Sequence, residues 1–200
     1  MEDDKTLSAI GEWPKTTIGP GAHAVIRHAY EQVLDSCARL GVFATGNPPL
    51  TEGPIAERQE FLAIDDLLNF SIHARRLIES TVGSKRIKTV TIPIKNPKTK
   101  GIGAWKLINA IVHHNDIHII RTTFQLRLYM GDSLENLTPL MISGNKENKS
   151  FPPMMIVKSD QEKYTTFEIV NLIEIFQEKV LSPIIDLCDE QNLFLNNDLA

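Results

Sequence analysis

The sequence predicts an α+β domain: amphipathic helices packed on a small antiparallel β-sheet, with a long C-terminal helix. Residues 22–40, 54–80 and 165–188 place apolar side chains three and four positions apart, which is the period of a helix buried on one face. Residues 87–94 and 124–130 instead alternate apolar and polar side chains, which is typical of strands. Because the later strands follow one another with short connections, we expect antiparallel pairing.

The first two helices are delimited by glycine and proline. Gly41 directly follows the apolar stripe of residues 22–40, where a C-terminal glycine would end a helix. The second helix should start at Pro54, which suits a first helical turn, and end before Val82-Gly83. At 1.5 Å per residue it would be about 40 Å long. We therefore expect it to form the spine of the domain.

The β-sheet is predicted from four segments. Ile87–Ile94 reads as a strand whose later part lies at an edge or an end, because Pro93 cannot donate a ladder hydrogen bond. Ile117–Met130, Leu140–Ser143 and Met154–Lys158 are the other candidates. A basic loop (95–103) and a short helix (104–114) separate the first strand from the second.

The last helix has a strong start signal. Thr165 and Glu168 have the spacing of a capping box, in which each side chain satisfies a backbone N–H of the first turn. An apolar face from Ile169 to Val180 follows. Pro183 should kink this helix and start a second segment that runs through Cys188.

Length and composition indicate one domain. The 200 residues contain 42% apolar and 23% charged side chains, and we expect a tail at 1–20 and a single domain at 21–195. No apolar run approaches 18 residues and the start lacks the pattern of a secretory signal, so no membrane association is expected. Cys37 and Cys188 match no disulfide or metal pattern, which favours reduced thiols in a cytoplasmic protein.

Charge is unevenly distributed along the chain. Residues 80–115 contain no Asp or Glu but hold seven of the 21 Lys and Arg residues, which leaves 14 basic against 25 acidic residues elsewhere. We expect a cationic face that binds nucleic acid or another anionic partner. An ordinary solvated basic loop is the alternative. The predicted anion-binding residues are Arg75, Arg76, Lys85, Arg86, Lys88, Lys95, Lys98 and Lys100. The adjacent Arg75 and Arg76 could grip phosphate oxygens bidentately.

Two histidine arrangements could support chemistry. His114 and His118 would share one helix face and could bridge a metal, but Ile117–Ile120 reads as strand, so we expect no metal and no cofactor. On the second helix, Asp66, Asn69 and His73 follow helical spacing, and a carboxylate there could orient the imidazole. The alternative for that helix is a solvated face with ion pairs.

Residues 54–115 resemble HEPN-type helical domains in two segments, His73-Ala-Arg-Arg-Leu-Ile-Glu79 and Trp105-Lys-Leu-Ile-Asn-Ala-Ile-Val-His113. The resemblance implies a ribonuclease of a defence or toxin system. The family motif sets an Arg shortly before a His, whereas here Lys106 precedes His113 and the Arg is missing. The strands after residue 115 do not belong to that pattern.

Two functions therefore remain open. We expect a non-catalytic binding or interaction module with a basic face, since no nucleophile elbow, dinucleotide fingerprint or kinase motif is present. The alternative is a phosphodiester-cleaving enzyme with His113 as acid or base, Lys106 or Arg76 stabilising phosphate charge and Asn109 orienting the substrate. Helical spacing puts Lys106, Asn109 and His113 on one face, although Asn109 and His113 could simply hydrogen-bond in a packed interface. Unpaired sheet edges and long apolar helices also predict a homodimer.

Overall fold

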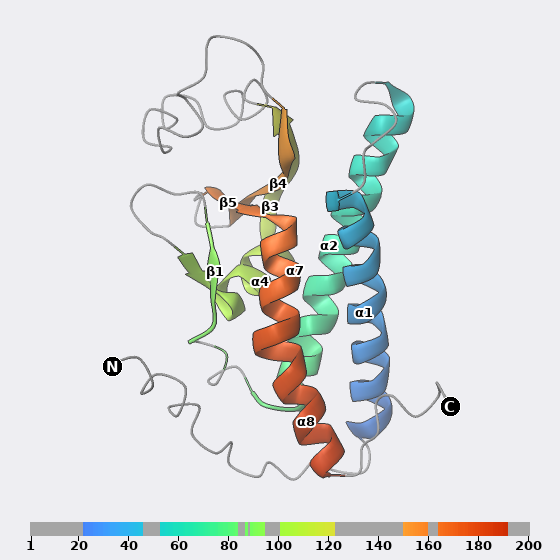
Figure 1. Cartoon of the computed structure of the whole chain (residues 1–200), viewed down its shortest axis with the longest axis vertical. Helices are drawn as coiled ribbons and strands as arrows, with labels where there is room; N and C mark the ends of the chain where they lie inside the picture. The colour runs from blue at the N-terminus through green and yellow to red at the C-terminus, as the bar shows by residue number, and fades with distance from the viewer. Residues whose placement is uncertain are drawn as a thin grey trace, which may run out of the picture.

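The computed structural model of the chain describes residues 22–45, 53–83, 87, 89–94, 101–122, 150–159 and 164–191. Within these residues, helices pack on small antiparallel sheets, so the predicted α+β class is confirmed. The sheets lie on one side, the helices α1 and α2 on the other, and the C-terminal helix α7 stands between them (Figure 1). One buried apolar cluster joins all three parts.

Helices α1 (His23–Thr45) and α2 (Pro54–Ser80) form an antiparallel pair. Their facing side chains are fully buried; they include Val33, Leu40, Leu67, Phe70 and Leu77. The expected end of α1 at Gly41 is wrong, because the helix continues through Gly41 to Thr45. The additional turn buries Ala44, and this burial offsets the helix-weakening effect of one glycine. The predicted bounds of α2 are confirmed.

Strands β1 (Thr91–Pro93) and β2 (Gly101–Gly103) pair antiparallel, with Pro93 opposite Gly101. The strand predicted over 87–94 is therefore shorter than expected, and residues 101–103 form a strand where a loop was expected. Ile87 lies in a helical turn, closed by a hydrogen bond of 3.1 Å from the Val90 N–H to the Ile87 carbonyl. Pro93 ends β1, in agreement with the prediction from its missing N–H.

The larger sheet has the strand order β3-β4-β5 within the described residues, and both pairs are antiparallel. Its strands are β3 (His114–Thr122), β4 (Ser150–Ser159) and β5 (Tyr164–Glu168). The predicted segments at 117–122 and 154–158 are confirmed as strand. The segments predicted at 123–130 and Leu140–Ser143 lie outside the described residues.

The capping box predicted at Thr165 is wrong. Thr165 pairs with Val157 and Glu168 pairs with Met154, so both residues belong to β5. Helix α7 (Ile169–Phe176) begins only after Glu168, and no side chain caps its first turn. Phe167 and Thr166 are buried. Pairing with β4 and burial of these two side chains outweigh one or two capping hydrogen bonds.

Pro183 is accommodated by a local change of helix type. A π-helical segment, η3 (Gln177–Leu181), lies between α7 and α8 (Ser182–Glu190), and the three follow one another without a break. Proline removes one backbone donor and crowds the carbonyl four residues earlier, so a wider turn relieves the clash. The Gln177 carbonyl accepts both the Ser182 N–H and, at 3.2 Å, the Ser182 hydroxyl.

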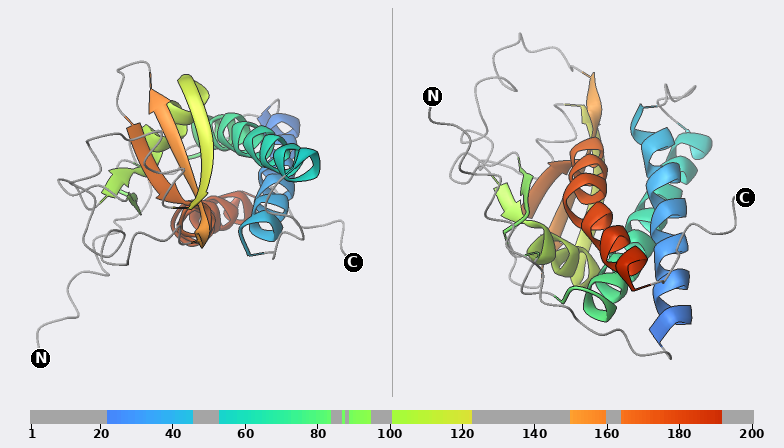
Figure 2. Two further views of the ribbon diagram at one scale, coloured as in Figure 1. Left: turned by 90° about the horizontal axis from the view of Figure 1, so that it is seen from above. Right: turned by 60° about the horizontal axis from the view of Figure 1, so that its bottom comes forward.

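Helix α4 (Ala104–Val112) packs against α2 and the sheets. With the bottom of the molecule turned forward, α4 and the C-terminal helices both lie in front of the strands of the larger sheet (Figure 2), and their buried side chains share one cluster with Met155 and Val157 of β4. Among the described residues, no helix is long and apolar enough to cross a bilayer.

Candidate functional site

Helix α4 presents the three residues predicted to act together on its outward side. Its buried residues are Ala104, Leu107, Ile108 and Ile111, which form the inward face. Lys106 and His113 are exposed and Asn109 is half-buried. The spacing of three and four residues therefore brings these three side chains to one outward face, as expected from the sequence.

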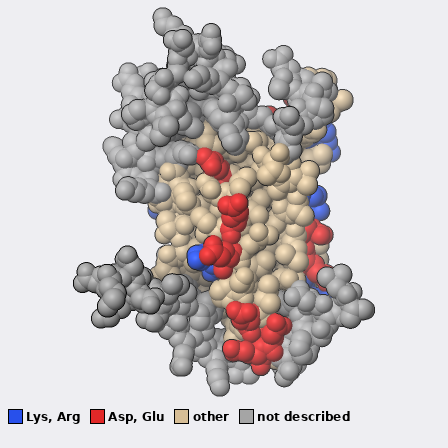
Figure 3. Space-filling view, viewed as in Figure 1, with Lys and Arg blue, Asp and Glu red and all other residues tan. Residues whose placement is uncertain are grey.

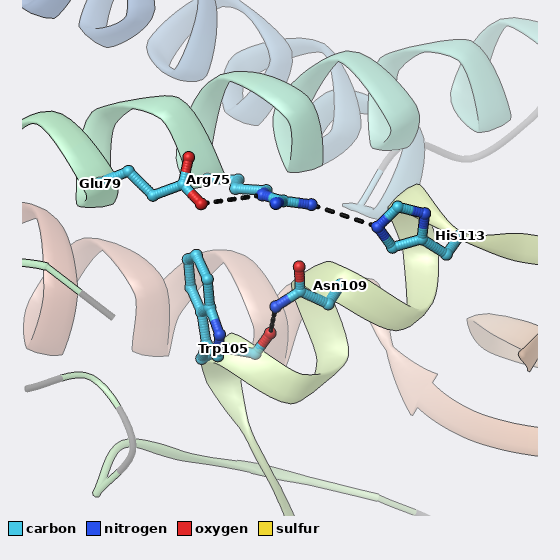
Figure 4. Close-up of polar contacts among 5 residues, drawn as sticks. All are labelled: Arg75, Glu79, Trp105, Asn109 and His113. Carbon is cyan, nitrogen blue, oxygen red and sulfur yellow. Dashed lines mark hydrogen bonds and ion pairs between the residues drawn. The ribbon is translucent and has the colours of Figure 1, made fainter. Parts of the chain in front are cut away.

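Arg75 of α2 joins this face (Figure 4). Its Nη1 lies 3.2 Å from Nε2 of His113, and its Nε lies 3.1 Å from a carboxylate oxygen of Glu79. The guanidinium carbon is also 5.9 Å from the centre of the Trp105 ring, within the range of a cation–π contact. One guanidinium therefore connects α2 to both ends of α4.

The contact between Arg75 and His113 defines the state of the imidazole. A guanidinium has only donors, so Nε2 of His113 must accept and the ring must carry its proton on Nδ1. The ring is exposed at the C-terminal end of α4. A neutral imidazole beside a cation can accept a proton from a substrate hydroxyl only after Arg75 moves away from Nε2.

The side-chain amide of Asn109 does not bond the imidazole of His113; the two residues meet through the backbone, where the His113 N–H donates 2.9 Å to the Asn109 carbonyl. Nδ2 of Asn109 donates 2.8 Å to the carbonyl of Trp105, one turn back along α4 (Figure 4). This bond holds the amide along the helix rather than across to the imidazole. Arg75, from a different element, takes the position beside His113 that the sequence assigned to Asn109 and Lys106.

The two adjacent arginines of α2 point to different neighbours. Arg75 reaches α4, whereas the charge of Arg76 acts on His73. Successive residues of an α-helix are separated by about 100°, so the two guanidiniums leave the helix in different directions. That Arg75 and Arg76 bind one phosphate together stays a prediction.

His73 meets a histidine from α1 rather than a carboxylate of its own helix. The rings of His28 and His73 are 5.4 Å apart and nearly perpendicular. Asp66, expected near His73, instead binds Arg39 at 2.6 Å. Burial lowers the pKa of His73, and the charges of His28 and Arg76 lower it further. Its Nδ1 is buried without a hydrogen-bond partner in the described structure.

The backbone amides before α4 are partly used by the protein itself. Gly103 precedes the helix, and the Ala104 N–H donates 2.7 Å to the carbonyl of Val90. The Ala104 N–H is therefore not available to an anion. Gly101 and Gly103 both lie in β2 and pair with β1.

Six of the predicted cationic residues lie outside the described residues: Lys85, Arg86, Lys88, Lys95, Lys98 and Lys100. Their role as an anion-binding face remains a prediction. Acidic side chains, in contrast, gather on the C-terminal helices, as the red atoms over α7 and α8 show (Figure 3). The exposed charged residues there are Glu174, Glu178, Lys179, Asp186, Asp189 and Glu190.

His114 and His118 both lie in β3. His118 was predicted in a strand, but His114 was expected at the end of the short helix, which instead ends at Val112. Four residues along a strand span about 13 Å, too far for one metal ion. Nε2 of His118 instead pairs with Asp116 at 2.7 Å, since residues two apart share a strand face. Among the described residues, no group of three or more His, Cys, Asp or Glu side chains could hold a metal ion.

Sequence reasoning missed three partners at these sites: Glu79 and Trp105 beside Arg75, and His28 beside His73. The pair of Arg75 and Glu79 has the spacing of a helical ion pair and could have been found from the sequence. The contacts of Trp105 and His28 cross between helices, so no local pattern announces them. No family model, curated protein or solved structure matches this chain.

Proposed function

We propose that this protein is a non-catalytic binding module that meets an anionic partner, nucleic acid first among them, through the side that carries α4 and the β1–β2 strands. The observation that carries the proposal is the separation of charge. The segment that contains β1, β2 and α4 has no Asp or Glu, whereas α7–α8 exposes five carboxylates and one lysine. A polyanion can approach the first side without meeting acidic side chains of that segment.

The described part of this side supports the proposal with a cationic and aromatic surface. Lys106 is exposed on α4, and Arg75 lies beside the half-buried Trp105. Glu79 neutralises part of the charge of Arg75, so the basic residues of 85–100 must supply most of the attraction. Trp105 would offer a stacking surface for a base.

The test is binding of a fluorescent single-stranded RNA or DNA at several salt concentrations. Affinity should fall steeply with salt, because phosphate contacts release counterions. The combined change Lys95→Glu, Lys98→Glu and Lys100→Glu should abolish binding. Lys106→Glu alone should weaken it several-fold, with a smaller salt dependence than the native chain.

Lys179→Glu is the matched control, since it makes the same charge change on the acidic α7–α8 side. It should leave binding unchanged. Circular dichroism should show native helix content for every variant. Absence of salt-sensitive binding to RNA, DNA and heparin would refute the proposed function.

A second candidate function is phosphodiester cleavage, as the resemblance to HEPN-type domains implies. The observation that favours it is the exposed His113 beside the Arg75 guanidinium, which offers a base next to a phosphate-binding group. Incubation with structured and unstructured RNA should then give fragments that disappear in His113→Ala and in Arg75→Ala. Cleavage that persists in His113→Ala, or its absence in the native chain, would exclude this candidate.

We place this function in the cytoplasm. Cys37 and Cys188 are both free and buried. Unpaired thiols are usual in a reducing compartment.

A further inference from the structure

The outer side of the N-terminal half of α2 exposes large apolar side chains. Ile55 is 59% exposed, Phe61 60% and Leu62 47%. The opposite side of the same helix is buried against the core through Ala63 and Leu67. Three large apolar side chains within eight residues on one exposed helix side mark an interaction surface.

Two opposite charges flank the apolar pair Phe61-Leu62. Arg58 stands three residues before Phe61, and Asp65 stands three residues after Leu62; both are exposed. Neither takes part in an ion pair within the described residues, in contrast to Arg39 and Asp66 nearby. The pattern is therefore symmetric about the point between Phe61 and Leu62, with a cation on one side and an anion at the same distance on the other.

This symmetry continues one step outward. Ile55 lies three residues before Arg58, and the partly buried Leu68 lies three residues after Asp65. From Ile55 towards the centre, the order of side chains is apolar, positive, apolar. From Leu68 towards the centre, it is apolar, negative, apolar. The segment from Ile55 to Leu68 is about 20 Å long at 1.5 Å per residue.

We propose that this stripe (Ile55, Arg58, Phe61, Leu62 and Asp65) is the surface on which a second copy of the chain docks, with the two α2 helices antiparallel. The two-fold axis passes between Phe61 and Leu62. Phe61 then packs on the partner subunit's Leu62, and Arg58 pairs with the partner subunit's Asp65, each contact occurring twice. None of the residues assigned to anion binding takes part.

The charge pattern selects the antiparallel orientation. In a parallel pair Arg58 would face Arg58 of the partner subunit, and Asp65 would face the partner's Asp65. Each of these two like-charge contacts would be repulsive. The antiparallel pair replaces both repulsions with attractions. It also places the two helix dipoles antiparallel, so that the positive end of each helix lies beside the negative end of the other. An unrelated partner would not need a pattern that is complementary to itself.

The experiment is sedimentation equilibrium of the full chain from 1 to 100 µM with charge-reversal variants. We expect a dimer for the native chain. Arg58→Asp alone and Asp65→Arg alone each place like charges opposite one another and should weaken the dimer about tenfold or more. The double variant Arg58→Asp/Asp65→Arg restores opposite charges and should recover the native dissociation constant.

Controls separate this interface from general effects of charge and burial. Asp35→Arg makes the same change at an exposed position of α1 and should leave the dimer unchanged. Phe61→Ser/Leu62→Ser should give monomers with native circular dichroism, whereas Val25→Ser, on exposed Val25 of α1, should not. A native chain that stays monomeric at 100 µM would overturn the proposal. So would a dimer that tolerates both single reversals, or a double reversal that fails to rescue, since either result means another face or another orientation.

Discussion

Arg75 donates to Nε2 of His113 at 3.2 Å, across 38 residues of sequence and from one helix to another. The same guanidinium binds Glu79 and lies over the Trp105 ring. A structural role and a functional role both follow from this one position. It fixes α4 on α2, and it holds a cation beside the exposed imidazole of His113.

Removal of Arg75 should therefore destabilise the fold modestly. We expect Arg75→Ala to lower the free energy of unfolding by about 1 kcal/mol, from the lost hydrogen bond and cation–π contact at a partly exposed site. Arg76→Ala, at the exposed neighbour, should stay within about 0.5 kcal/mol of the native chain. Urea denaturation measures both values.

A double-mutant cycle of Arg75→Ala and His113→Ala tests the contact itself. The coupling energy should be about 0.5–1 kcal/mol. Strict additivity of the two changes would show that the pair contributes nothing to stability.

The lowered pKa of His73 predicts a loss of stability in mild acid. Burial and the charges of His28 and Arg76 keep the folded ring neutral below its ordinary pKa of 6.5. Once the pH falls below about 6.5, the unfolded chain binds more protons than the folded one, so the free energy of unfolding decreases. The loss continues until the pH passes below the lowered pKa of the folded ring.

Replacement of His73 should remove this part of the pH dependence. The difference in unfolding free energy between pH 7.5 and pH 5.5 should be smaller in His73→Leu than in the native chain. His23→Leu, at an exposed position in the first turn of α1, serves as the control and should keep the native difference. Equal pH profiles for all three proteins would contradict the prediction.

The two glycines at 101 and 41 should respond in opposite ways to alanine. A Cβ at Gly101 would collide with Cγ2 of Thr91 and would lie 3.0 Å from the Ile92 carbonyl oxygen. Gly101→Ala should therefore cost about 1–3 kcal/mol, because the Thr91 side chain and the β1 backbone at Ile92 must both shift. At Gly41, inside α1, a Cβ meets no atom within 4 Å.

Gly41→Ala should stabilise the protein by about 0.5–1 kcal/mol, because alanine loses less backbone entropy in a helix. Thermal denaturation of the two variants in parallel measures the contrast. An equal loss of stability in both would mean that α1 does not continue past residue 41.

The thiols should be unreactive in the native protein. Burial raises the pKa of Cys37 to about 12, and burial together with the charge of Asp189 raises that of Cys188 to about 11. Because the thiolate is the nucleophile, a disulfide reagent at pH 8 should modify neither residue until the chain unfolds. Ala38→Cys, exposed beside Cys37 on α1, should add one rapidly reacting thiol. Rapid reaction of the native chain would show that the core opens.

Elements whose signals are local and repeated could be predicted from the amino-acid sequence alone. The 27 residues of α2 were predicted from the apolar period and from Pro54, because many buried positions along one face agree. The same period placed Lys106, Asn109 and His113 on one side of α4. The strand character of Ile117–Ile120 was likewise predicted from the sequence, and these residues lie in β3.

Where two local signals compete, contacts between distant elements determine which structure forms. Thr165 and Glu168 have the spacing of a helix cap, but pairing with β4 makes them strand, since a neighbouring strand satisfies more backbone groups than one cap. Gly41 lies inside α1 because the next turn buries Ala44 and packs Phe43 against the core. The partner of His113 is Arg75 rather than Asn109, and the partner of His73 is His28. Contacts between elements distant in sequence depend on how helices pack, and no spacing within one segment contains that information.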